Sequence, residues 1–159
     1  MAMVRAFVPT TLDGLRALAS DGAVPAGSPA ALPTPGLRAL PAAAGADAEE
    51  LDYLALRVAA AESLRLLAGS GAQRPADLRR VVLAVDVPPS EVAEMDAAGT
   101  GRVRLAAPVP LGRVAAVFVD EPSASAAVGD AVAAGGTPDA VADVDLLWYA
   151  TQEIPDLAG

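Results

Sequence analysis

The chain has 159 residues, contains neither cysteine nor histidine, and uses arginine for all 11 of its basic residues. These absences exclude disulfides, thiolate nucleophiles, imidazole-bound zinc, Ser-His-Asp catalysis and lysine Schiff bases, so any metal would need oxygen ligands. The formal net charge of -9 argues against the phosphate backbone of a nucleic acid as the main partner.

Length and composition predict one α+β domain, residues 1–159, in the cytoplasm. Hydrophobic residues make up 53% of the chain and aromatic residues only 3%, so the core must consist mainly of Ala, Val and Leu. The first eight residues reach Pro9 without a long apolar stretch, unlike a signal peptide. The most apolar long stretch, Leu51 to Ala68, is interrupted by three charged residues, which argues against a membrane span.

The first predicted elements are a strand and a short helix. Apolar residues alternate over Met3 to Val8, which is typical of a strand. Thr10 or Thr11 can cap the following helix, and Gly22 stands where a left-handed residue would end it.

A long loop and the longest helix follow. Residues 23–46 are rich in Pro, Gly, Ser and Ala, which predicts a long loop. Within it, Thr34 followed by Pro35 could start one helical turn through Leu40. Asp47 with Glu50 three residues later forms the signature of a capping box, and a mostly apolar helix runs from there to Gly69 or Gly71.

Three apolar segments punctuated by Pro or Gly predict the central strands of the sheet: Arg79–Val85, Arg102–Ala107 and Val114–Val119. Leu146–Ala150 is a further strand candidate, although Asp145 could instead cap a helix there. We therefore expect a small mixed sheet of about four to five strands, covered by one long helix and several short helices.

Two groups of residues could bind an anion. Thr10 and Thr11 offer hydroxyl groups and free amides at a helix N-terminus. Arg102 and Arg104 share one strand face and could form a cationic patch. For each group we favour a plainer interpretation, namely helix capping for the threonines and surface ion pairs for the arginines.

The C-terminal segment is the one place where aromatic residues meet amide and carboxylate groups. Trp148 and Tyr149 are followed by Gln152 and Glu153, which could form a binding wall or a pocket with Glu153 as general base. We favour the interpretation that Trp148 fills the core, because tryptophan is usually largely buried. The sequence indicates no cofactor and no complete metal site.

The two ends of the chain carry a family resemblance. The segments Val4–Leu12 and Leu146–Pro155 resemble the ends of a family of small actinobacterial proteins that has only an uncharacterised-domain label, and Glu49–Leu67 and Pro108–Asp120 fit its middle. This resemblance covers nearly the whole chain and implies one cytoplasmic domain but no activity. The strand, threonine turn and helix layout is also similar to ADP-ribosyltransferase-like folds, although no catalytic residue carries over.

Two functional hypotheses remain open at this point. The first is a non-enzymatic binding or protein-interaction domain that uses the segment around Trp148 or an uncovered sheet edge, with a homodimer as one option. The second is an enzyme or binding protein for a nucleotide-like or anionic small molecule. A pocket holding Glu153 beside an arginine would favour the second, and an exposed apolar face around Trp148 would favour the first.

Overall fold

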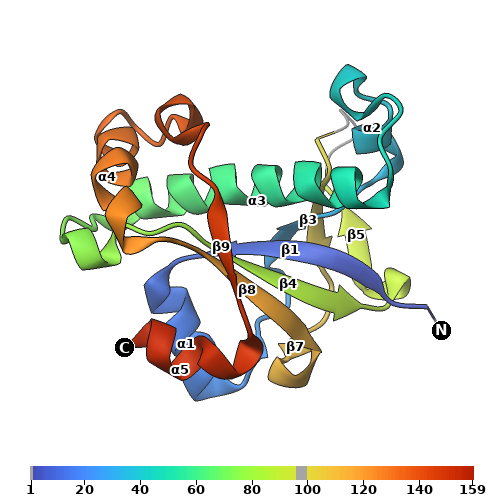
Figure 1. Cartoon of the computed structure of the whole chain (residues 1–159). Helices are drawn as coiled ribbons and strands as arrows, with labels where there is room; N and C mark the ends of the chain where they lie inside the picture. The colour runs from blue at the N-terminus through green and yellow to red at the C-terminus, as the bar shows by residue number, and fades with distance from the viewer. Residues whose placement is uncertain (1, 96–99) are drawn as a thin grey trace.

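The computed structural model describes residues 2–95 and 100–159. Within them, a seven-stranded antiparallel sheet carries helices on both faces (Figure 1). The strands are β1 (Val4–Thr10), β2 (Ala23–Val24), β3 (Pro29–Ala31), β4 (Val81–Val87), β5 (Val92–Glu94), β6 (Arg102–Leu105), β7 (Val109–Pro110), β8 (Val114–Asp120) and β9 (Leu146–Tyr149). The α-helices are α1 (Leu12–Asp21), α2 (Pro35–Arg38), α3 (Ala48–Ser70), α4 (Ser125–Ala133) and α5 (Ile154–Ala158). Short 3-10 turns are η1 (Pro41–Ala43), η2 (Pro75–Asp77), η3 (Pro89–Glu91), η4 (Leu111–Arg113), η5 (Pro122–Ala124), η6 (Pro138–Val141) and η7 (Thr151–Glu153).

The main sheet has the order β5-β6-β3-β1-β4-β8-β9, while β2 and β7 pair separately. The expected mixed sheet of about four to five strands is therefore wrong in both number and type, although an α+β fold is confirmed. Residues 23–46, expected as a long loop, contain the unexpected strands β2 and β3. The helical turn expected after Thr34 is confirmed as α2. Strand β3 has the sequence Pro-Ala-Ala, which has low strand propensity, and it forms because β1 and β6 flank it.

Strand β1 occupies the middle of the sheet, with three strands on each side. Of the three segments predicted as central strands, only β4 lies beside β1. The prediction is wrong for β6 and β8, because each lies one strand from an edge of the described sheet. Strand β4 has apolar residues on both faces, as expected: Val81, Leu83 and Val85 pack into one cluster, and Val82 and Ala84 into another.

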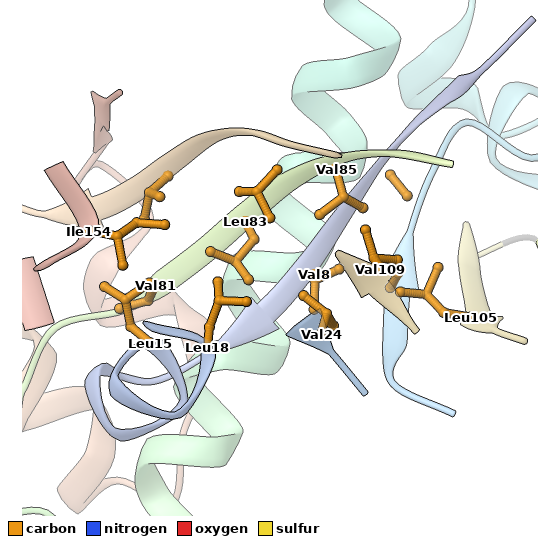
Figure 2. Packing of buried hydrophobic residues seen from close by; sticks show 14 of the residues in the cluster. Val8, Leu15, Leu18, Val24, Val81, Leu83, Val85, Leu105, Val109 and Ile154 are labelled. Atoms are coloured by element: carbon orange, nitrogen blue, oxygen red, sulfur yellow. The ribbon is translucent and has the colours of Figure 1, made fainter. Parts of the chain in front are cut away.

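One face of the sheet is covered by α1, α5 and the β2–β7 pair. Figure 2 shows Leu15 and Leu18 of α1 meeting Val81 and Val8 of the sheet, with Ile154 of α5 beside them. All of these side chains are almost inaccessible to solvent. The first and last helices of the chain therefore share one core with the central strands.

The opposite face is covered by α3 (Figure 1). Asp47 accepts a hydrogen bond from the amide of Glu50 at 2.9 Å, and the Glu50 side chain accepts one from the amide of Asp47 at 2.8 Å, which confirms the capping box. The helix presents Ala55 and Ala59 to the sheet, which lets its backbone approach closely. Among the residues that the structure describes, no helix has the length and apolar character needed to cross a membrane.

The C-terminal half of α3 also packs against α4 and η6. Leu64 and Leu67 form a third apolar cluster with Val128 of α4 and Val141 of η6. The chain then returns from η6 across α3 to β9 at the edge of the sheet (Figure 1). This return path creates the hollow described below.

Candidate functional site

The two threonines of the predicted anion site make contacts within the fold. The hydroxyl oxygen of Thr11 caps α1 by accepting a hydrogen bond from the amide of Gly14 at 3.2 Å. The Thr10 carbonyl accepts a hydrogen bond from the Ser63 hydroxyl at 2.7 Å. A Cβ atom at Gly14 would lie 1.9 Å from the Thr10 hydroxyl oxygen, so this hydroxyl is packed tightly against α1. Thr11 is therefore the helix cap, whereas Thr10 is the last residue of β1.

The two arginines of β6 also have partners. Arg102 forms an ion pair with Glu62 of α3. Arg104 donates a hydrogen bond from Nη1 to the carbonyl of Gly27 at 2.6 Å. These contacts connect β6 to α3 and to the turn at Gly27, and the Arg104 side chain remains exposed to solvent.

Strand β9 carries the aromatic pair of the C-terminal segment. Of the strand and helix alternatives at these residues, the strand is observed. The interpretation that Trp148 fills the core is wrong, because its side chain is 61% exposed. It lies opposite Phe118 on the last strand of the described sheet, so no further strand covers it. Leu147 is 41% exposed, whereas Tyr149 is half-buried against the core.

Gln152 and Glu153 lie beyond β9, and both are exposed. The Glu153 carboxylate accepts a hydrogen bond from the amide of Ala150 at 2.7 Å, so it acts as a local cap of η7. Within the described residues no arginine forms an ion pair with Glu153. The structure thus does not bring Glu153 together with Arg102 or Arg104.

A pocket of about 390 Å³ lies between α3, the strands β8 and β9, and the segment from η6 to β9. Its apolar wall includes Leu56 of α3, Phe118 of β8, Leu146 of β9 and Val141 of η6. Because Phe118 lies opposite Trp148, the pocket and the exposed edge of β9 adjoin each other on the same face of the sheet. Its volume is within the range of small-molecule sites.

Four polar side chains line this pocket: Tyr53, Arg57, Arg80 and Asp145. The Tyr53 hydroxyl donates to Asp145 Oδ1 at the long distance of 3.4 Å. Arg57 is exposed, and it has no hydrogen bond or ion pair within residues 2–95 and 100–159. The remaining ten arginines each have at least one such contact.

A buried ion pair holds one side of the pocket in place. Arg80 and Asp120 are 6% and 0% exposed, and their side chains are joined by hydrogen bonds of 2.9 and 2.8 Å. Arg80 also donates to the carbonyl of Val144 at 2.9 Å, which fixes the segment leading into β9. Because its charge is matched by Asp120, Arg80 is a structural element of the wall, and Arg57 is the unmatched cation.

A family model described as "Family of unknown function (DUF6912)" matches residues 4–158. The chain belongs to this family. Comparison with curated proteins and with solved structures gives no match. Family membership attaches no activity to the chain, so a functional proposal depends on the edge of β9 and on the adjoining pocket.

Sequence reasoning missed the pocket residues Tyr53, Arg57 and Phe118. In the sequence, Arg57 is one of the charged residues that interrupt the apolar stretch from Leu51 to Ala68, and no binding role was predicted for it. The sequence does contain a signal for Arg57, namely the residues at helical spacing from it. Arg16 and Arg65 each have an acidic residue three positions away. Around Arg57, the residues three and four positions away are Tyr, Leu, Ala and Ala, and none of them is acidic. An arginine on a predicted helix without an acidic neighbour at helical spacing is a candidate for binding something else.

Proposed function

We propose that the chain is a non-enzymatic, cytoplasmic protein-interaction domain that binds a partner strand along the outer edge of β9. The observation that carries this proposal is the exposure of Trp148 and Leu147, at 61% and 41%, on the last strand of the described sheet. An edge strand presents unpaired backbone groups that another strand can use, and exposed tryptophan is typical of binding hot spots.

The partner we infer is a second copy of this chain. Strand β9 reads Leu-Leu-Trp-Tyr and carries no charge, although the chain has a net charge of -9. Like charges directly opposite each other on two paired strands are destabilising. When two copies of β9 pair, no such charges face each other within the strand. Such a pairing has two-fold symmetry and uses the same surface on both copies, as in C2 dimers, which are the commonest closed oligomers.

The register of this dimer follows from the two faces of a strand. Directly opposed residues in an antiparallel pair lie on the same face of the sheet, whereas successive residues of one strand lie on opposite faces. A two-fold axis between two successive residues would oppose residues of different faces, so the axis must pass beside a single residue. An axis beside Trp148 places Trp148 against Trp148 of the second copy, and Leu147 against Tyr149. An axis beside Leu147 would place Tyr149 against Asp145, which is less favourable. The first register extends the row formed by Phe118 and Trp148.

The test is the molar mass in solution, measured by sedimentation equilibrium over a concentration series. We expect a monomer–dimer equilibrium whose Trp148 fluorescence shifts to shorter wavelength as the dimer forms. Trp148→Ala should raise the dimer Kd about tenfold or more, because an aromatic pair and its buried area are lost. Leu147→Asp should abolish the dimer by placing a carboxylate in the interface.

Leu66→Asp is the matched control, because Leu66 is 44% exposed on α3 and lies outside β9. It should leave the dimer Kd unchanged, and circular dichroism should show that all three variants remain folded. A monomer at every concentration would rule out the second copy as partner. A dimer that Leu66→Asp weakens as strongly as Leu147→Asp would show that the interface lies elsewhere.

A further inference from the structure

We propose that the pocket bounded by α3, β8 and η6 binds a small monocarboxylate with an apolar body, and that Arg57 pairs with the carboxylate. This inference does not depend on the pairing of β9. It rests on the shape of the pocket, on the apolar character of its walls and on the unmatched charge at its mouth.

The walls select the apolar part of the ligand. Leu56, Phe118 and Leu146 are half-buried, and Val141 is almost fully buried, so the pocket offers a continuous apolar surface. A volume of about 390 Å³ accommodates an aromatic ring or a branched aliphatic chain. Such a group would cover the exposed part of the Phe118 ring, and the removal of this apolar surface from water would favour binding. Among the described residues, Phe7 is the aromatic neighbour of Phe118.

Arg57 selects the charged part of the ligand. Four arginines have no ion pair in the described residues, and three of them, Arg38, Arg79 and Arg104, donate to backbone carbonyls instead. Arg57 has neither kind of contact there, so its guanidinium donors are available to a ligand. A guanidinium group with free donors can bind a carboxylate through two parallel hydrogen bonds. At the edge of an apolar pocket, this interaction is stronger than in open solvent.

Asp145 limits the charge that the pocket accepts. Its carboxylate lines the same pocket, and its Oδ1 accepts a hydrogen bond from the Tyr53 hydroxyl at 3.4 Å. A dianion such as inorganic phosphate would be repelled by Asp145, whereas a monocarboxylate can place its one charge at Arg57 and its apolar body against Phe118. The long hydrogen bond leaves the Tyr53 hydroxyl able to turn towards the ligand.

The experiment is a titration of the whole ¹⁵N-labelled protein, observed by NMR, with benzoate, indole-3-acetate, 4-methylpentanoate and inorganic phosphate. We expect at least one carboxylate to give saturable shifts at the amides of Ala60, Val141 and Leu146, and phosphate to give none there. Arg57→Gln should raise the Kd of that carboxylate about tenfold or more, while the Kd of its neutral amide analogue stays unchanged.

Two further variants complete the test. Arg65→Gln is the matched control, because Arg65 is an exposed arginine two turns further along α3 and outside the pocket, and it should leave the carboxylate Kd unchanged. Ala61→Phe should fill the pocket and abolish binding of acid and amide alike. The proposal is overturned by absence of saturable shifts at millimolar carboxylate, by shifts confined to other parts of the chain, or by equal affinity in wild type and Arg57→Gln.

Discussion

At the residue scale, Asp52 on α3 shows how partial burial acts on a charged side chain. Burial raises the pKa of the Asp52 carboxyl above its ordinary value of 3.8, and the nearby charges of Arg5 and Arg38 lower the pKa by a smaller amount. The folded state therefore holds the proton more tightly than the unfolded state does. Consequently the free energy of unfolding falls as pH rises from 3.8 through the raised pKa of the folded state.

Replacing Asp52 with Asn should remove this pH-dependent cost. We expect Asp52→Asn to have a higher Tm than wild type at neutral pH, where the aspartate is charged, and a similar Tm below pH 3.8, where both side chains are neutral. Thermal unfolding followed by circular dichroism across this pH range measures the difference. A lower Tm of the variant at neutral pH would mean that attraction to Arg5 and Arg38 outweighs the cost of burial.

Individual residues also mark where sequence reasoning reached its limit. The capping box at Asp47 is local, so its pattern predicts the structure directly. The exposure of Trp148 depends on the position of β9 in the sheet, which local spacing does not contain. The general preference of tryptophan for burial therefore gave the wrong prediction that Trp148 fills the core. The adjoining pocket was not predicted, because it is built from segments that are far apart in the chain.

At the scale of elements, Ser63 links α3 to the sheet through two buried hydrogen bonds. Its hydroxyl donates to the Thr10 carbonyl of β1 at 2.7 Å and accepts from the Val81 amide of β4 at 3.0 Å. The side chain is completely buried. One hydroxyl thus satisfies a carbonyl and an amide at the ends of two neighbouring strands, and it fixes where α3 sits along them.

We expect Ser63→Ala to lower the free energy of unfolding by about 1–3 kcal/mol, because a buried amide and a buried carbonyl lose their partner. Urea unfolding monitored by circular dichroism measures this change. Ser70→Ala is the control, because Ser70 lies at the exposed end of the same helix, and it should cost less than about 0.5 kcal/mol. Equal effects of the two substitutions would contradict a special role of Ser63.

Elements differ in how far their sequences specify them. Helix α3 and strand β4 combine length with a clear apolar pattern, and both were predicted from the sequence. Strands β3 and β5 have three residues each, too few for a periodic pattern. They exist because β6 lies beside them, so the count of strands in the sheet could not be read from the sequence alone.

At the scale of the whole molecule, the first and last helices of the chain meet on one face of the sheet. Helix α5 packs against α1, and Arg16 of α1 donates a hydrogen bond to the carbonyl of Ala158 at 2.7 Å. Ile154 is 1% exposed and belongs to the cluster that also contains Leu15 and Val81. The segment that follows β9 is thus part of the main core, so we expect it to unfold together with the central strands.

Ile154→Ala tests this cooperativity. We expect it to lower the free energy of unfolding by about 2–5 kcal/mol, and Ile154→Val by about 0.5–1.5 kcal/mol, in proportion to the methyl groups removed from the core. In each variant the Trp148 fluorescence of β9 and the far-ultraviolet circular dichroism of the helices should report the same urea midpoint. If the fluorescence midpoint fell while the circular dichroism midpoint stayed constant, β9 and α5 would unfold separately. Such separate unfolding would make the edge of β9 a mobile binding segment instead of a rigid one, because a strand held only by β8 would pair with a partner only after ordering.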